Sequence, residues 1–322
     1  MNPAAELFAE HQPSPEGPVV GPGGWILNVV SITAADKDWQ ARGGDISATH
    51  TSRPGETHRV FTTSEAHVEG IPAALAFGPD GCLYVTDEGR RSIIRVAPDG
   101  VQTDFISTFE GQPINGPNDL SFDPDGNLFF TDPWGSSPNA LTGQVFGYEW
   151  ATGTLHLIDQ GMAFPNGIVV RDGRLFVAET FTNTIWVYEV TGPGQASGKT
   201  VFCRMPEVPD SPVRWEGRSL VGPDGIAFDD TGNLFATHIG SGDVIVYDPD
   251  GHQIDAIPSG GTTPTNVCFG GPAYNQLYVT VDDSASVVRF NLGVTGHRLS
   301  FCPSLVQNHP WASMLPQVPG RA

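Results

Sequence analysis

Short runs of alternating apolar and polar residues, each divided by a turn rich in Asp and Gly, recur along this chain. Five copies are clear: IPAALAFGPDGCLYVTD, GPNDLSFDPDGNLFFTD, FPNGIVVRDGRLFVAE, GPDGIAFDDTGNLFATH and TNVCFGGPAYNQLYVTV. A weaker copy, PEGPVVGPGGWILNVV, precedes them. Alternation with a period of two around a tight turn predicts a β-hairpin, so each copy is expected to form two antiparallel strands.

The copies are spaced by about 50 residues, which is the range of propeller blades. A second strand pair follows most of them, as in RRSIIRVAPDG, GQVFGYEW, NTIWVYEV and GDVIVYDPDG. Four strands per repeat and six repeats predict an all-β fold, a six-bladed β-propeller with four-stranded antiparallel blades. We expect residues 1–322 to form this single domain. The spacing widens across residues 203–221, which predicts either a lid over one end of the channel or a plain surface connection.

Equivalent positions of successive blades lie on a ring around the propeller axis, so one column of the repeat predicts a circle of side chains. The residues at the start of the innermost strands are Glu16, Ala73, Asn118, Asn166, Asp224 and Asn266. Five of these six side chains carry oxygen. A single Asn or Asp commonly caps a turn, but five in register predict a cation site. Oxygen ligands of mixed charge favour Ca²⁺; Mg²⁺, Mn²⁺ and Zn²⁺ remain alternatives, although zinc prefers His and Cys.

A second column follows from the hairpin, because its returning strand ends beside the ring residue. This column contains Asp87, Asp132, Glu179, His238 and Asp282. We expect Asp132 near Asn118, and His238 near Asp224. His238 then either assists proton transfer or only hydrogen-bonds a metal-binding group. The repeated D-P-D-G strings lack the third acidic position and the closing Glu of an EF-hand loop, so we interpret them as hairpin turns.

Composition narrows the range of partners. The 36 acidic residues against 16 basic ones give a formal charge of -20, which disfavours nucleic acid and anionic membranes. No stretch approaches the length of a membrane-spanning segment, and the first residues have no signal-peptide pattern. The four cysteines are widely separated and predict reduced, buried thiols, which is typical of a cytoplasmic protein. The oligomeric state stays open.

Together, the strings PEGPVV, GPNDLSFDPDGNLFFTDP, PNGI, GPDGIAFDDTGNLF and TNVCFGG resemble the senescence-marker-protein/gluconolactonase (regucalcin-like) family, over about residues 15–290. This resemblance implies a divalent metal in the propeller channel and hydrolysis of sugar lactones, aromatic lactones or some organophosphates. It also implies that Glu16, Asn166 and Asp224 are metal ligands. Asn118 would lie beside the metal and contact substrate or a bound water.

Two positions depart from the family pattern. Gly116 stands where the sugar-lactonase branch has an arginine, so we expect poor activity on sugar-acid lactones. Ala73 has no neighbouring histidine, which argues against a histidine base of the paraoxonase type.

We therefore hypothesise a metal-dependent hydrolase that opens a small lactone or ester. The metal would polarise the carbonyl and a carboxylate would activate water. Asp224 is the candidate base and His238 the candidate proton carrier, while substrate contacts are assigned to Asn118, Asn266 and Asp132. Two alternatives are a phosphotriesterase-type hydrolase and a metal-stabilised propeller that binds a ligand or partner without turnover.

Overall fold

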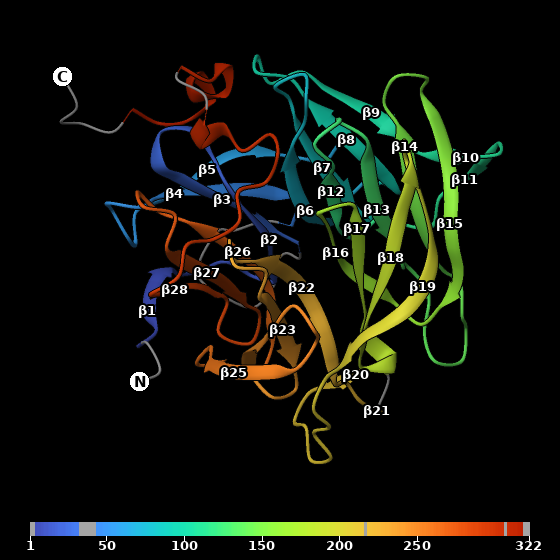
Figure 1. Ribbon diagram of the computed structural model, residues 1–322. Coiled ribbons are helices and arrows are strands. Elements are labelled where there is room, and N and C mark those ends of the chain that lie inside the picture. The colour runs from blue at the N-terminus through green and yellow to red at the C-terminus, as the bar shows by residue number, and fades with distance from the viewer. Residues whose placement is uncertain (1–3, 32–42, 216–217, 306–307, 318–322) are drawn as a thin grey trace.

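The computed structural model describes residues 4–31, 43–215, 218–305 and 308–317. In these residues the chain forms six four-stranded antiparallel sheets around a central channel (Figure 1). This arrangement confirms the predicted six-bladed propeller. Each hairpin found in the sequence supplies the two strands of a blade nearest the axis.

The first three blades follow the repeat in order, from the channel to the rim. Blade one contains β2 (Pro15–Val20), β3 (Trp25–Val30), β4 (Asp45–His50) and β5 (Thr57–Thr62). Blade two contains β6 (Pro72–Phe77), β7 (Leu83–Asp87), β8 (Ser92–Val96) and β9 (Gln102–Ile106). Blade three contains β12 (Leu120–Phe122), β13 (Leu128–Asp132), β14 (Gly143–Glu149) and β15 (Thr154–Met162).

The remaining blades complete the circle. Blade four contains β16 (Pro165–Arg171), β17 (Arg174–Glu179), β18 (Thr184–Gly192) and β19 (Gln195–Arg204). Blade five contains β22 (Gly222–Phe228), β23 (Leu234–Ile239), β24 (Asp243–Tyr247) and β25 (Gln253–Pro258). Blade six contains β26 (Pro264–Gly270), β27 (Gln276–Val281), β28 (Ser286–Asn291) and, at its rim, β1 (Glu6–Ala9).

Short elements decorate the connections between blades. Two small hairpins are formed by β10 (Thr108–Phe109) with β11 (Gln112–Pro113), and by β20 (Arg214–Trp215) with β21 (Arg218–Ser219). The 3-10 helices are η1 (Pro22–Gly24), η2 (Thr180–Thr182), η3 (Pro303–Leu305) and η4 (Pro310–Met314).

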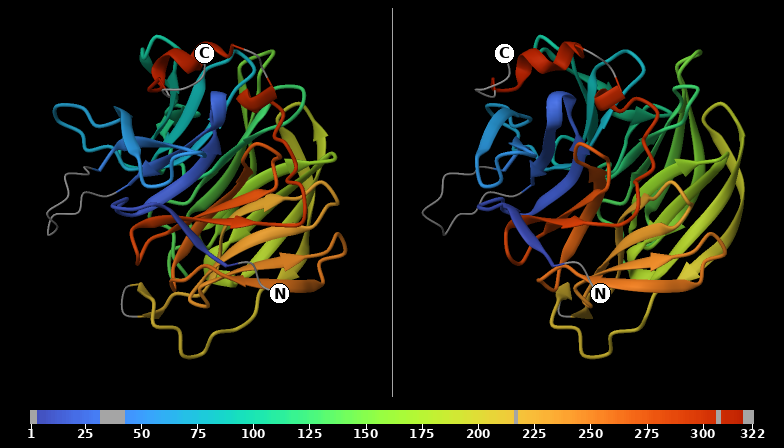
Figure 2. Two further views of the ribbon diagram at one scale, coloured as in Figure 1. Left: turned by 90° about the vertical axis from the view of Figure 1, so that its left-hand side faces the viewer. Right: turned by 60° about the vertical axis from the view of Figure 1, so that its left-hand side comes forward.

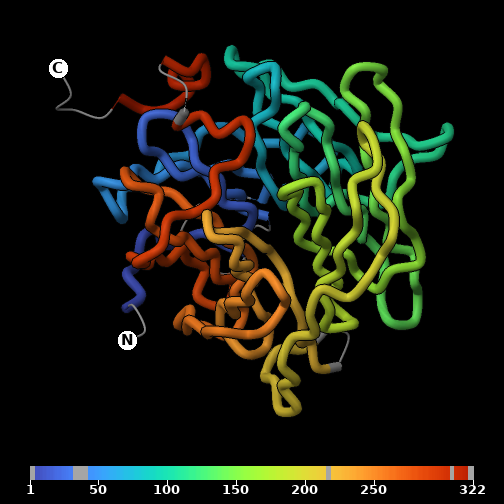
Figure 3. The backbone as a smooth tube through the Cα atoms, in the orientation of Figure 1, coloured from blue at the N-terminus to red at the C-terminus, as the bar shows by residue number. Residues whose placement is uncertain are grey.

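The N-terminal strand closes the ring of blades. β1 pairs antiparallel with β28, so residues from the two ends of the chain share blade six (Figure 3). Arg289 reinforces this pairing by donating to both carboxylate oxygens of Glu6, at 2.5 and 3.2 Å. The six inner strands also contact one another in order around the axis, from β2 through β26 and back to β2. The blades therefore form a closed ring, and pairing between the two ends of the chain completes its sixth blade.

Apolar side chains fill the spaces between neighbouring blades. The middle strands are buried on both faces, as Leu83, Leu128 and Leu234 show with no exposed surface. The four cysteines are free thiols, three of them buried and Cys268 half-buried. The prediction of unpaired thiols is confirmed.

The two ends of the channel differ. All inner strands begin at one end, which we call the acidic mouth, and finish at the other, the far mouth. The C-terminal segment lies across the far mouth, where the His297 N–H donates to the carbonyl of Phe228 at 2.8 Å. The connection before β22 lies at the opposite end of the molecule (Figure 2). No helix in the described residues is long and apolar enough to cross a membrane.

Candidate functional site

The inner strands bulge where the ring residues stand. Strand register breaks beside Glu16 in β2, Asn166 in β16 and Asp224 in β22. A bulge bends its strand and redirects a side chain, and these three side chains are buried or half-buried at the acidic mouth. Asn118 stands at the equivalent position just before β12. Its N–H donates to the carbonyl of Thr131 in β13 at 2.9 Å, which continues the hairpin ladder.

Buried hydroxyls link each blade to the start of the next inner strand. Thr86 donates to the carbonyl of Asn118 at 2.5 Å, and Thr131 donates to that of Asn166 at 2.7 Å. The other four junctions are Ser31 to Pro72, Thr180 to Pro223, Thr237 to Thr265, and Thr265 to Pro15. These bonds fix the ring positions relative to one another.

In blade six the predicted column is displaced by one residue. Asn266 is equivalent to Asp119, because the Asn266 N–H donates to Thr280 Oγ1 as the Asp119 N–H donates to Thr131 Oγ1. Thr265 is therefore the residue at the position of Asn118. Asn266 lies one step further into the channel, where its side chain hydrogen-bonds those of Glu16 and Asp119. The space is tight, since a Cβ on Gly225 would lie 2.1 Å from Asn266 Oδ1. The ring assignment of Asn266 is therefore corrected, although the residue still belongs to the site.

Four carboxylates gather at the acidic mouth, and we call Glu16, Glu88, Asp119 and Asp224 the acid cluster. Burial raises the pKa of Glu16 to about 8, despite a 2.7 Å hydrogen bond from the Gly17 N–H. Burial also raises the pKa of Asp224 well above its usual value, and repulsion from the other three carboxylates adds to the shift. Buried like charges disfavour ionisation unless a cation compensates them.

Glu88 and Asp119 were not identified from the sequence. Glu88 follows β7 and accepts a hydrogen bond from Asn118 Nδ2 at 3.0 Å, and burial raises its pKa to about 8. It brings a carboxylate to blade two, where the ring position itself is Ala73. Asp119 accepts from the N–H groups of Leu120 and Ile168, and burial raises its pKa to about 7. Their places in the sequence could have identified them, because Asp119 directly follows a ring residue and Glu88 directly follows a residue of the second column.

The second column mainly anchors the loops that lead into the inner strands. Asp132 accepts from the N–H groups of Asn115 and Gly116, at 2.8 and 2.6 Å. Glu179 accepts similarly from the Ala163 N–H at 2.6 Å. Both oxygens of Asp132 thus have backbone partners, so these contacts describe a loop anchor and give no support to substrate contact.

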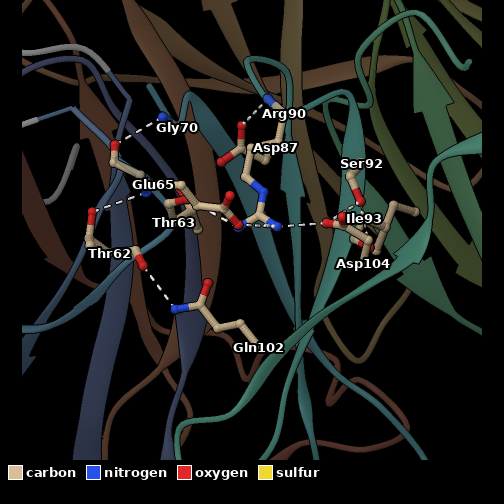
Figure 4. A network of polar contacts seen from close by, with 11 residues as sticks. Thr62, Thr63, Glu65, Gly70, Asp87, Arg90, Ser92, Ile93, Gln102 and Asp104 are labelled. Carbon is tan, nitrogen blue, oxygen red and sulfur yellow. Dashed lines mark hydrogen bonds and ion pairs between the residues drawn. The ribbon is translucent and has the colours of Figure 1, made fainter. Parts of the chain in front are cut away.

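Asp87 plays the same part in blade two and is embedded in a wider polar network (Figure 4). Its carboxylate accepts from the N–H groups of Ile71 and Arg90, at 2.9 and 2.8 Å. The Arg90 guanidinium lies between Glu65 and Asp104, at 3.0 and 2.7 Å. This network joins blade one to blade two beside the acidic mouth.

His238 is fully buried and has a protein partner at each ring nitrogen. Nδ1 lies 2.9 Å from Ser241 Oγ, and Nε2 lies 3.1 Å from Asn183 Oδ1. Burial lowers its pKa to about 4. The backbone of His238 pairs with Pro223, next to Asp224, but its side chain hydrogen-bonds neither this Asp nor another member of the acid cluster. These contacts favour the hydrogen-bonding alternative, and proton transfer stays a prediction.

The donor set fits a hard cation. Asp224 Oδ1 is buried and has no hydrogen-bond partner among the described residues. Asn118 and Asn166 donate through their amide nitrogens to Glu88 and Thr180, which turns each amide oxygen to the opposite side. Carboxylate and amide oxygens are the ligands that Ca²⁺ takes, with flexible geometry. The site therefore has the donor types that Ca²⁺ takes.

The D-P-D-G segments are turns, as predicted. Asp123 Oδ1 accepts from the N–H groups of Asp125 and Asn127, at 3.0 and 2.8 Å. Asp248 makes the same contacts with Asp250 and His252, whose side chains also lie close to it on the surface. The first Asp of each string thus shapes a hairpin.

A cavity of about 340 Å³ opens beside the acidic mouth, and we call it the mouth pocket. Its walls come from residues 137–139, 181–183 and 207–209, with Ser219 and Val221. The widened segment 203–221 therefore forms part of a pocket wall, although its residues 216–217 and the side chains of Trp215 and Arg218 lie outside the described part. At Gly116, an added Cβ would lie 2.7 Å from the Cβ of Trp134. An arginine at this position would collide with Trp134.

The fold and this site define a six-bladed propeller with buried carboxylates and amides at one end of its channel. The sequence profile of the SMP-30/gluconolactonase/LRE-like region matches residues 42–283. The chain belongs to this family.

Named relatives agree with this membership. The chain is 28% identical to a gluconolactonase of Zymomonas mobilis, over 71% of this chain and 68% of that protein. It is 32% identical to the diisopropyl-fluorophosphatase of Loligo vulgaris, over 73% and 76% of the two chains. The calcium-binding protein regucalcin of Agrobacterium tumefaciens shares the fold, with a TM-score of 0.73 at 19% identity over 93% of this chain and 97% of that one.

Proposed function

We propose that this protein is a divalent-cation-dependent lactonase that works with Ca²⁺ at the acidic mouth. The observation that carries the proposal is the acid cluster, in which Asp224 Oδ1 has no hydrogen-bond partner among the described residues. The chain also belongs to the SMP-30/gluconolactonase/LRE-like family. Similarity to the gluconolactonase from Zymomonas mobilis supports lactone hydrolysis as the reaction. Oxygen donors favour Ca²⁺ over Zn²⁺, while Mg²⁺ and Mn²⁺ accept a similar donor set.

Glu16, Asn166 and Asp224 would hold the ion, and Asn118 would direct its amide oxygen to the same place. When bound, such a cation polarises the ester carbonyl and stabilises the oxyanion that forms on attack by water. Glu88 orients Asn118 through their 3.0 Å hydrogen bond. The backbone bonds of Asp132 hold the loop beside it.

Asp224 is our candidate for the base that takes a proton from the attacking water. Its Oδ1 has no hydrogen-bond partner among the described residues, so this carboxylate oxygen is free to accept the proton. Asn266 and Asp119 also line the channel. His238 is buried, and each of its ring nitrogens has a protein partner. Substrate contacts by Asn118, Asn266 and Asp132, and a proton-carrying role for His238, remain part of the proposal.

A panel of γ- and δ-lactones, assayed with and without a chelator, tests the proposal. We expect hydrolysis of at least one lactone, loss of activity on chelation, and recovery on adding Ca²⁺. Hydrolysis that continues at full rate in excess chelator would contradict the metal-dependent mechanism. If no lactone is opened while Ca²⁺ still raises the melting temperature, the non-catalytic alternative is favoured.

A second candidate activity is hydrolysis of phosphorus esters. It is favoured by the 32% identity to the diisopropyl-fluorophosphatase of Loligo vulgaris. The same assay with a fluorophosphate triester compares the two activities. A rate with the triester that exceeds every lactone rate would select this candidate.

A further inference from the structure

The mouth pocket has a lining that mixes apolar with uncharged polar side chains and carries little charge. Its apolar side chains are Pro138, Phe181, Val208, Pro209 and Val221. Among the described residues that line it, the charged one is Glu207, which is exposed. A lining of neutral side chains with one carboxylate favours a ligand without negative charge.

The pocket is connected to the acid cluster by two short stretches of chain. Val221 in its wall stands three residues before Asp224. Phe181, in another wall, directly follows Thr180, whose hydroxyl accepts from Asn166 Nδ2 at 3.2 Å. A molecule whose ester group lies at the cluster would therefore extend its remaining atoms toward this pocket.

In the described part of the connection that precedes β22, the basic side chain is Arg214, and it is held by the connection itself. Arg214, on the same loop, donates from its Nη1 to the carbonyls of Ser211 and Val213 and to Ser219 Oγ. The chain has two lysines: Lys37 lies outside the described residues, and Lys199 pairs with Asp159 at 2.7 Å. The formal charge of -20 adds to the negative field at this mouth.

From this arrangement we infer that the mouth pocket selects uncharged lactones and that Glu207 disfavours lactones bearing a carboxylate or phosphate. This inference rests on the proposed lactonase function and adds the substrate class to it. The negative charge of Glu207 should also affect release of the product. Water adds to the carbonyl carbon, the acyl C–O bond breaks, the ring oxygen receives a proton, and the new acid loses a proton to solvent. A neutral substrate thus becomes an anionic product, which Glu207 helps to expel.

The test uses a matched pair of lactones that differ only in a carboxamide or a carboxylate substituent. The ratio of their kcat/KM values is measured for the Ca²⁺-loaded wild type, for Glu207→Gln and for Glu207→Lys. Matched controls are Glu110→Gln and Glu110→Lys, because Glu110 is exposed on the turn between β10 and β11. Glu110 is outside the set of residues that line the mouth pocket.

We expect the wild type to prefer the carboxamide. Relative to it, the carboxylate should gain about threefold in Glu207→Gln and about tenfold in Glu207→Lys, mainly through KM, as expected for charges that interact across water. Product inhibition should strengthen in the same order, and both effects should fade at high salt. The Glu110 variants should keep the wild-type ratio.

A ratio that stays constant in Glu207→Lys, or that changes equally in Glu110→Lys, would overturn the inference while leaving lactonase activity intact. If the wild type opens neither these two lactones nor any member of the lactone panel, the proposed function fails, and binding then tests the pocket by itself. Calorimetric titration with the corresponding cyclic ketones, one carboxamide and one carboxylate, should still show weaker binding of the anion and its relief in Glu207→Lys. Equal binding of both ketones would overturn the inference on this readout.

Discussion

Carboxylates that are buried together dominate the energetics of the acidic mouth. Glu16 and Glu88 have pKa values raised to about 8, and Asp119 to about 7, chiefly because burial penalises their charged forms. At neutral pH the site therefore holds protons or a cation. Binding Ca²⁺ should displace those protons, which couples cation affinity to pH.

The first prediction concerns stability against pH in the cation-free protein. An acid whose pKa is higher in the folded state binds more protons folded than unfolded, so its contribution to stability falls as pH rises between the two values. His238 opposes this trend at the lower end of the range from pH 6.5 to 8, because burial lowers its pKa from 6.5 to about 4 in the folded state. It contributes at most about half a proton, which is less than the raised carboxylates retain. Over this window the free energy of unfolding should fall by up to about 1.4 kcal/mol per pH unit for each retained proton, and the melting temperature should fall with it.

Scanning calorimetry at several pH values checks this expectation. The Ca²⁺-loaded protein is the control and should lose much less stability over the same range, because the cation compensates the ionised carboxylates. A cation-free protein whose melting temperature rises from pH 6.5 to 8 would contradict the account of the acid cluster.

The second prediction separates Asp224 as ligand from Asp224 as base. Asp224→Asn keeps a side-chain oxygen for the cation but removes the basic carboxylate. At saturating Ca²⁺ the variant should bind the ion and lose roughly 100-fold or more in kcat, the scale of general base catalysis. Metal content must be measured beside the rate, because a metal-free variant would be inactive for a different reason.

A metal-loaded Asp224→Asn enzyme that turns over at nearly the parental rate would show that Asp224 is a ligand only. His238→Gln is then the next comparison. The contacts with Ser241 and Asn183 predict a loss of stability with little change in kcat. A large loss of kcat without loss of metal would instead assign proton transfer to His238.

At the residue scale, the repeat predicted Glu16, Asn118, Asn166 and Asp224 at equivalent positions because each starts an inner strand. Asn266 was placed one residue out of register, since a bulge is not visible in an apolar pattern. Glu88 and Asp119 lie outside the repeating column, and their membership in the cluster depends on how neighbouring blades approach one another. Spacing within one hairpin carries no information about that approach.

At the scale of elements, buried hydroxyls connect the blades at their inner edges. Thr131 Oγ1 accepts from the Asp119 N–H at 3.1 Å and donates to the Asn166 carbonyl at 2.7 Å. One side chain thus aligns a member of the acid cluster with a ring residue of the next blade.

The third prediction is that Thr131→Val lowers the free energy of unfolding by about 1–3 kcal/mol, because it leaves a buried N–H and a buried carbonyl without their partner. It should also weaken Ca²⁺ binding, since Asn166 loses a positioning contact. Chemical denaturation and calcium titration measure the two effects. Thr103→Val, at an exposed position of β9, is the matched control. Equal stabilities for the two variants would contradict a structural role for these hydroxyls.

The hairpins were predictable because each combines two apolar strands with its own turn in about 17 consecutive residues. β1 was not predicted, because its four residues pair with β28 at the other end of the chain. The hydroxyl junctions were missed for a related reason: Thr fits any half-buried strand position, so its type does not reveal a bond to the next blade.

At the scale of the whole molecule, the C-terminal segment connects distant parts of the ring across the far mouth. Its residues near His297 contact blade five, whereas Trp311 packs against Phe61 and Phe77 of blades one and two. Trp311 has no exposed surface, and its Nε1 donates to the Val96 carbonyl at 3.3 Å. The segment should therefore stabilise the propeller and leave the acidic mouth unchanged.

The fourth prediction follows: Trp311→Ala should lower the free energy of unfolding by about 3–5 kcal/mol, the cost of emptying a large buried site. Calcium affinity of the folded protein should stay the same. Trp134→Ala, at a residue that is 42% exposed, is the control for the loss of a tryptophan. A similar stability for both variants would show that the C-terminal segment does not hold the ring together.

Calorimetric titration of the cation-free protein with Ca²⁺ tests the central claim most directly. We predict binding at the acidic mouth that releases protons and weakens by roughly tenfold or more in Glu16→Gln, because the variant loses one of the charged oxygen ligands of the proposed set. Glu110→Gln, at an exposed Glu outside the site, should bind as the wild type does. Absence of binding, or an affinity that Glu16→Gln leaves unchanged, would contradict a cation site at the acidic mouth and the mechanism built on it.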